Sequence, residues 1–98
     1  MRREMLAIAT ATLLTLPAIA QERQAEVLAG PCMTCHGLDG RSHGAIPALA
    51  GNDANQMATM MKAFASGAAR GTVMNYIAKG YTSEQIDAVA AFFASRKR

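Results

Sequence analysis

Two cysteines and a histidine stand together in the run Cys32-Met33-Thr34-Cys35-His36. Two thiols separated by two residues can each add to a vinyl group on the same edge of a porphyrin and form two thioether bonds. The adjoining imidazole then lies under the ring and offers a nitrogen to the iron. This spacing is the attachment signature of a c-type haem. It predicts one covalent haem, with His36 as a ligand of the iron.

Three other interpretations of these residues compete with haem attachment. A thiol–disulfide oxidoreductase also uses C-x-x-C, but beside a βαβ pattern, and this sequence has almost no strand signal. A structural zinc site needs four ligands, so His43 would have to join Cys32, Cys35 and His36 at an unusual spacing. A disulfide between the two cysteines would close a very small, strained loop. Haem attachment agrees best with the size and helical pattern of the chain.

Iron that only carries electrons needs a sixth ligand, for which the chain offers His43 and several methionines. His43 follows in a glycine-rich segment on the same side as His36 and is predicted to lie at the surface. The residues Met57, Met60, Met61 and Phe64 have helical spacing, which is typical of a core stripe. Met74 lies between predicted helices, where a loop can bring its thioether to the iron.

We therefore predict Met74 as the distal ligand, with Met60 or Met61 as the alternatives. Ligation by histidine and methionine raises the reduction potential relative to histidine alone. Six-coordinate iron has no open position for a substrate, so the chain is not expected to be an enzyme on its own.

The surroundings of the haem can also be predicted. A metal-bound histidine normally donates its other ring N–H to a carbonyl or carboxylate, and the Pro47 carbonyl is the candidate acceptor for His36. Alternatively, Pro47 only stiffens its loop. Five apolar residues are candidates for the wall of the haem pocket: Ile46, Leu49, Phe64, Ile77 and Phe93. Three residues are candidates for contact with the propionates, or are ordinary surface residues: Arg41, Tyr76 and Tyr81.

The first twenty residues have the layout of a cleavable signal peptide. Arg2 and Arg3 precede a run without charge, which ends in the small-x-small sequence Ala18-Ile19-Ala20. The run is shorter than the roughly 20 apolar residues of a membrane-spanning helix, so an uncleaved anchor is the less favoured alternative. The sequence thus predicts a leader over residues 1–20, export to the periplasm, and a mature domain over residues 21–98 with no membrane span.

The mature part is so small that its core is expected to need additional stabilisation by a disulfide, a metal or a cofactor. Its two cysteines allow at most one internal disulfide. The formal net charge of the whole chain is +3. This excess of positive charge is mild, and the sequence contains neither a basic stripe nor a recognisable DNA-recognition element. Both observations argue against nucleic-acid binding. The tail Arg96-Lys97-Arg98 is predicted to be a solvated helix end, where cations suit the helix dipole.

The pattern predicts an all-α fold of three or four helices. One helix is expected over residues 22–29, and residues 37–51 are expected to form a loop. A second helix begins after an N-cap at Asn52 or Asp53 and ends near residue 66, and a short helix falls within residues 71–79. Thr82 and Gln85 form a capping box for the last helix. Its predicted buried stripe is Ile86, Val89, Ala90 and Phe93.

The order of these features resembles class I cytochrome c. Within that class, four stretches resemble the cytochrome subunit of flavocytochrome c sulfide dehydrogenase: CMTCHGLDG (32–40), IPALAG (46–51), MKAFASG (61–67) and TVMNYIAKGY (72–81). The resemblance implies a small class I fold around the haem. It also implies that the methionine before Ile-Ala-Lys-Gly-Tyr, here Met74, ligates the iron.

The same resemblance implies a partner. In that family, an FAD-containing subunit oxidises sulfide and passes electrons to the cytochrome, which passes them to a soluble acceptor. Many members carry two haem domains, whereas this sequence has one haem motif and resembles a single-haem form. A freely diffusing monohaem electron shuttle is the alternative to a subunit held in such a complex.

Overall fold

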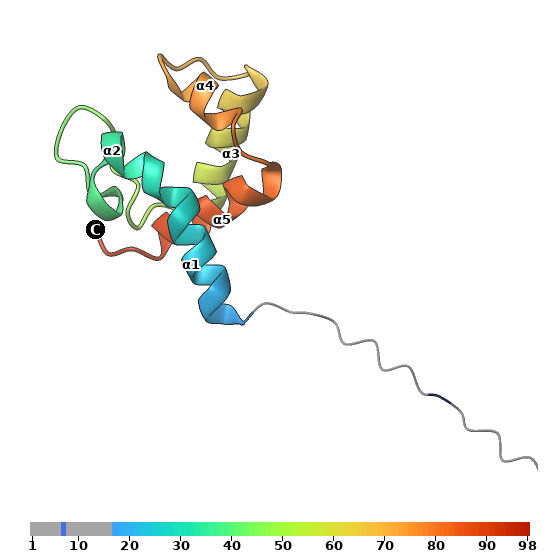
Figure 1. Ribbon diagram of the computed structural model, residues 1–98. Coiled ribbons are helices and arrows are strands. Elements are labelled where there is room, and N and C mark those ends of the chain that lie inside the picture. Colours follow the sequence, from blue (N-terminus) through green and yellow to red (C-terminus); the bar gives the residue numbers. More distant parts are fainter. Residues whose placement is uncertain (1–6, 8–16) are drawn as a thin grey trace, which may run out of the picture.

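The computed structural model describes Ala7 and residues 17–98, and every regular element in this part of the chain is a helix. The prediction of an all-α fold is confirmed. The leader predicted over residues 1–20 falls mostly outside the described residues. The helices are α1 (Ala18–Ala29), α2 (Met33–His36), α3 (Ala54–Ser66), α4 (Met74–Ala78) and α5 (Ser83–Ala94), with short 3₁₀ turns η1 (Gly30–Cys32) and η2 (Leu38–Gly40) (Figure 1).

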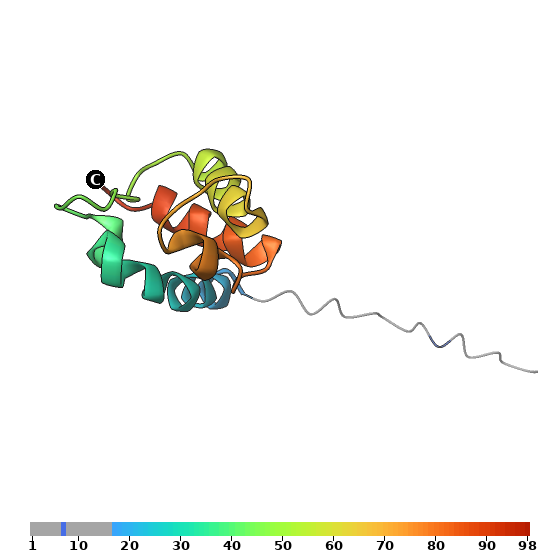
Figure 2. The ribbon, with the colours of Figure 1, turned by 90° about the horizontal axis from the view of Figure 1, so that it is seen from above.

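Helix α5 is the centre of the fold. It lies between α1 and α3, and α4 packs on α3 (Figure 2). Toward α1, the buried side chains of Val89, Phe92 and Phe93 cluster with Ala29. Toward α3, Ile86 and Ala90 cluster with Ala58. The predicted α5 stripe is therefore confirmed, since all four of its residues are buried. Each large side chain that is fully buried contributes about 1.5–3 kcal/mol.

Side-chain caps define where the two long helices after the haem motif begin. The Asp53 carboxylate accepts a hydrogen bond from the Gln56 backbone N–H at 2.9 Å, directly before α3. At α5, the Gln85 N–H donates to Thr82 Oγ1 at 3.1 Å, and the Thr82 N–H donates to Gln85 Oε1 at 2.9 Å. Both bonds of the predicted capping box are therefore present, and Asp53 is the N-cap of α3.

Helix α1 begins earlier than the sequence analysis predicted. It starts at Ala18, four positions before residue 22, directly after Pro17 with its φ of −54°. Proline is compatible with a helix start, and alanine has the highest helix propensity, which accounts for the extension. The chain does not leave the helical path at Gly30 and Pro31, because η1 carries it into α2. The haem motif is thus attached directly to the C-terminal end of α1 (Figure 1).

The basic tail departs from the prediction of a solvated helix end. Helix α5 ends at Ala94, and the Arg96 guanidinium lies 4.0 Å from the centre of the Phe92 ring, where it is half-buried. The tail then meets the loop that follows the haem motif, since Arg41 Nε donates to the Lys97 carbonyl at 2.6 Å. Figure 1 shows the C-terminus beside this loop. The prediction was wrong for Arg96 because its planar guanidinium stacks on an aromatic ring.

Candidate haem site

The cysteines of the motif lie on one short helical segment. Cys32 ends η1, and Cys35 falls within α2. Residues three positions apart in a helix lie on the same face, so both thiols are presented to the same side. Both cysteines are free; Cys32 is half-buried and Cys35 is exposed. The structure therefore does not contain the Cys32–Cys35 disulfide that was one alternative interpretation.

His36 is oriented by a backbone carbonyl from the following loop. Its Nδ1 lies 2.6 Å from the carbonyl oxygen of Pro47, the acceptor that the sequence analysis considered. A carbonyl can only accept a hydrogen bond, so Nδ1 carries the hydrogen and Nε2 of the neutral ring keeps a free lone pair. This is the tautomer that a metal-ligating histidine requires when it binds through Nε2.

The loop that carries Pro47 is held by hydrogen bonds of the residues directly after it. The backbone N–H groups of Leu49 and Ala50 donate to the Gly40 carbonyl at 2.7 and 3.1 Å. The Asn52 side-chain amide donates to the Ala48 carbonyl at 2.8 Å. The Pro47 carbonyl is therefore fixed by short bonds to its neighbours, and it can hold the His36 ring in one orientation.

Two glycines near His36 are structural requirements that the sequence analysis did not identify. Gly37 has a φ of +86°, and a Cβ there would lie 2.8 Å from the Ser42 backbone nitrogen. Gly40 has a φ of +78°, and a Cβ there would lie 2.7 Å from Cδ1 of Phe93. A side chain at either position would meet both backbone strain and a steric clash. The position of Gly37 directly after the motif was the only signal in the sequence.

Tyr81 connects the Cys32 region to α1. Its hydroxyl donates to the Leu28 carbonyl at 2.9 Å. Burial raises the pKa of the Cys32 thiol, and a hydrogen bond with Tyr81 partly opposes that effect. Reactive thiols of redox enzymes have lowered pKa values, so this environment disfavours the thiol–disulfide interpretation. The Tyr81 hydroxyl thus donates its hydrogen to a carbonyl of the fold, and not to a haem propionate, which was one of the two predictions for this residue.

The methionines fall into two groups by their packing. Met57 and Met61 pack against buried residues of α5. Met60 is 52% exposed on α3, and half-buried Met74 is the first residue of α4. The short helix predicted within residues 71–79 is therefore present, and Met74 is its first residue rather than part of the loop before it. Met60 and Met74 are the candidates whose side chains the core does not use.

Several large apolar side chains remain uncovered on the segments around His36 and Met74. Ile46 is 42% exposed, Val73 54% and Ile77 37%. Among the other wall candidates, Phe93 is 1% exposed within the core between α1 and α5, and Leu49 packs against that core. Two free thiols on one face, an available imidazole nitrogen and uncovered apolar side chains are the donor set and surface that a covalently attached haem requires.

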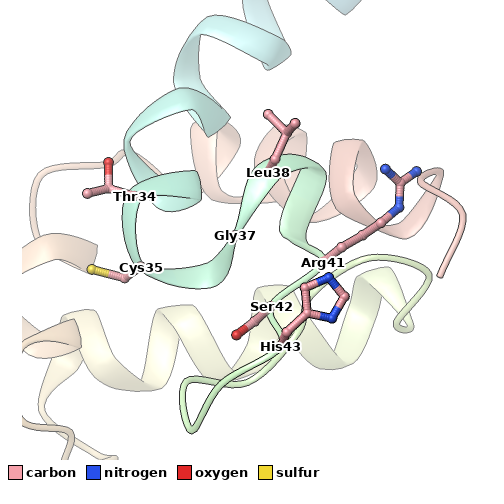
Figure 3. A pocket seen from close by; sticks show the side chains of 7 residues that line it. All are labelled: Thr34, Cys35, Gly37, Leu38, Arg41, Ser42 and His43. Atoms are coloured by element: carbon pink, nitrogen blue, oxygen red, sulfur yellow. The ribbon is translucent and has the colours of Figure 1, made fainter.

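An open hollow of about 400 Å³ lies beside α2. Figure 3 shows its seven lining residues: Thr34, Cys35, Gly37, Leu38, Arg41, Ser42 and His43. The Arg41 side chain extends from this loop toward the C-terminal segment, as its bond to Lys97 requires.

His43 is exposed, as predicted. Within residues 17–98 no three histidine, cysteine or acidic side chains form a group that could hold a metal ion, so the ligands of the zinc alternative do not assemble.

Comparison with known proteins decides which family this site belongs to. The family model described as Cytochrome c matches residues 22–97, which include the whole haem motif. The chain belongs to the cytochrome c family. Haem c is therefore its cofactor, and electron transfer is its biochemical role. The described helices of this cytochrome include none that is long and apolar enough to cross a membrane.

The curated relatives of this cytochrome include a subunit of sulfide dehydrogenase and electron acceptors of thiosulfate dehydrogenase. It is 38% identical to the cytochrome subunit of sulfide dehydrogenase from Chlorobaculum tepidum, over 76% of this chain and 67% of that protein. It is 34% identical to the thiosulfate dehydrogenase electron acceptor of Thiomonas intermedia, over 97% of this chain and 45% of that protein. The family resemblance noted in the sequence is therefore confirmed.

A solved structure confirms the fold. Cytochrome c4 of Acidithiobacillus ferrooxidans superposes with a TM-score of 0.72 at 32% identity, and the match covers 78% of this chain and 49% of that one. This cytochrome thus has the class I cytochrome c fold. It spans about two thirds of the sulfide dehydrogenase subunit and about half of cytochrome c4.

Proposed function

We propose that this cytochrome is a periplasmic single-haem subunit that accepts electrons from an FAD-containing sulfide dehydrogenase and passes them to a soluble acceptor. The similarity to the Chlorobaculum tepidum subunit, at 38% identity over 76% of this chain, carries the proposal. Haem c supplies reversible one-electron chemistry at its iron when it is bound. The flavin and the sulfide site belong to the partner subunit.

The proposed roles of the site residues follow from their chemistry. The S–H groups of Cys32 and Cys35 would add across the two vinyl groups of the haem, so that each sulfur bonds to carbon and its hydrogen goes to the neighbouring vinyl carbon. This addition needs no oxidant. His36 would hold the iron through Nε2, while its Nδ1–H donates to the Pro47 carbonyl at 2.6 Å. The hydrogen bond increases the basicity of the imidazole and fixes its plane.

We assign the distal position to Met74. Met57 and Met61 are used by the core, which leaves Met60 and Met74. Of these two, Met74 is the methionine before Ile-Ala-Lys-Gly-Tyr that the family resemblance implies as the ligand. Met74 begins α4, which packs on α3 and leaves Met74 half-buried. If His36 and Met74 both hold the iron, no position would remain for a substrate, so catalysis would belong to the partner and electron transfer to this chain.

The proposed location rests on the leader over residues 1–20. Cleavage after Ala20 would remove the first three residues of α1, of which Ala18 and Ile19 are exposed and Ala20 is partly exposed. None of them belongs to the buried core. The domain over residues 21–98 would therefore keep its packing after processing.

A freely diffusing shuttle is the second candidate. The similarity to the thiosulfate dehydrogenase electron acceptor of Thiomonas intermedia, which extends over 97% of this chain, favours it. Purification from the native host distinguishes the two functions. A subunit copurifies with an FAD-containing chain, and sulfide reduces the haem of that complex. Isolation of the cytochrome without flavin supports the shuttle, and a flavin complex that sulfide cannot reduce contradicts the proposed substrate.

A further inference from the structure

The side chain of Asn75 ties α4 to the segment that precedes it. Its Nδ2 donates to the Phe64 carbonyl at 2.9 Å and to the Ala69 carbonyl at 2.8 Å. Its Oδ1 accepts from the Gly71 backbone N–H at 2.9 Å. One amide therefore uses both of its N–H groups and its oxygen. These bonds reach the last turn of α3 and two positions of the connection between α3 and α4.

Helix α4 packs on α3, but little in the helix itself fixes its first turn. It has five residues, and Val73 at its N-terminus makes no side-chain cap. A helix of this length is not stable by itself in water. Ala78 is its one buried residue, while Tyr76 and Ile77 are exposed. The position of its first turn therefore depends strongly on the three bonds of Asn75.

Met74 immediately precedes Asn75 in that first turn. We infer that Asn75 is the positioning residue for the distal methionine: its bonds to Phe64, Ala69 and Gly71 hold the backbone of Met74 where the thioether stays bound to iron. This inference rests on the proposed role of Met74. No pattern in the sequence points to Asn75, because the spacing between the four residues does not reveal the three contacts.

Competition with imidazole in the oxidised, haem-bearing protein measures how firmly Met74 is held. Imidazole binds iron only when the methionine has left, so its apparent affinity reports the fraction of protein in which Met74 is detached. Asn75→Ala removes all three bonds and is expected to strengthen imidazole binding about tenfold, from the net contribution of such hydrogen bonds. Asn75→Asp keeps an acceptor for the Gly71 N–H but lacks both donors, and it is expected to strengthen binding at least about threefold.

The same substitution in a Met74→Ala background separates positioning from general stability. With no methionine to displace, Asn75→Ala should leave imidazole affinity unchanged within about twofold, as a double-mutant cycle requires. Asn55→Ala changes an exposed asparagine of α3 and is the matched control. Thr82→Ala destabilises α5 instead, and it is expected to leave imidazole affinity unchanged although it lowers stability.

Amide exchange of Gly71 provides a readout that does not involve the iron. In the parent protein its N–H is bonded to Asn75 Oδ1, and exchange should become faster in Asn75→Ala. The inference is supported if both Asn75 variants bind imidazole more tightly and the effect vanishes without Met74. It is overturned if the variants keep the parent affinity, or if the effect persists in Met74→Ala. If Met74→Ala retains the methionine–iron band, the assignment of the ligand itself fails, independently of Asn75.

Discussion

The Nδ1 atom of His36 lies 2.6 Å from the carbonyl oxygen of Pro47, eleven residues further along the chain. This distance joins the haem motif on α2 to the loop that follows it, and it determines which imidazole nitrogen is available for iron. The loop is in turn bonded to Gly40 and to Phe93 of α5. The orientation of the proposed proximal ligand is thus connected to the helical core.

This contact can be tested by exchanging Pro47 for alanine, which keeps the carbonyl and frees φ. Pro47→Ala should retain a slowly exchanging His36 Nδ1–H in the NMR spectrum. Stability should fall by about 0.4–1 kcal/mol, because the unfolded chain gains conformational freedom. An Nδ1–H that exchanges in the parent protein as fast as an exposed imidazole would show that Pro47 only stiffens the loop.

Met74→Ala should remove the methionine–iron charge-transfer band while the haem stays attached through Cys32 and Cys35. The reduction potential should also fall, because methionine ligation raises it. The absorption spectrum of the oxidised protein makes the measurement. Met60→Ala is the matched control and should keep the band. A band that survives in Met74→Ala and is lost in Met60→Ala would move the distal ligand to α3.

Gly40→Ala should destabilise the protein by about 2–5 kcal/mol. An alanine there would have to adopt a left-handed backbone conformation, which costs about 1–2 kcal/mol. It would also overpack against the Phe93 ring, which costs about 1–3 kcal/mol. Denaturant unfolding measures the loss. Gly44→Ala in the same loop is the control, since a Cβ there meets nothing within 4 Å and φ is not left-handed. Equal stability of the two variants would mean that Gly40 does not approach Phe93.

Thr82→Ala should cost about 1 kcal/mol through loss of the capping box at the start of α5. Ser83→Ala, one residue later, removes a hydroxyl that makes no cap and should change stability by less than about 0.5 kcal/mol. Thermal unfolding of both variants checks the difference. A Thr82→Ala protein as stable as the parent would indicate that packing alone determines where α5 begins.

Patterns that depend on neighbouring residues could be predicted from the sequence. The caps at Asp53 and Thr82 and the buried stripe of α5 follow from local spacing, and each was found. The start of α1 was placed too late because Ala18–Ala20 had been assigned to a leader. Contacts between distant residues leave no periodic signal, which is why the bonds of Asn75 and the stacking of Arg96 on Phe92 were not foreseen.

The site, too, could be predicted only as far as local patterns in the sequence reach. The types and spacing of Cys32, Cys35 and His36 identify the chemistry, since two thiols and an imidazole at those intervals have one common use. Which methionine completes the site depends on what each side chain packs against. The structure answers part of that question, because Met57 and Met61 pack against the core.

The amount of covalently bound haem per chain tests the central claim most directly. The chain is produced together with the haem-attachment machinery and exported, and the haem is quantified from its pyridine haemochrome spectrum after extraction with acidic acetone. The account predicts one haem per chain that resists extraction, and no attached haem when Cys32 and Cys35 are both replaced by serine. A parent protein without a Soret band, but with two titratable thiols, would contradict it.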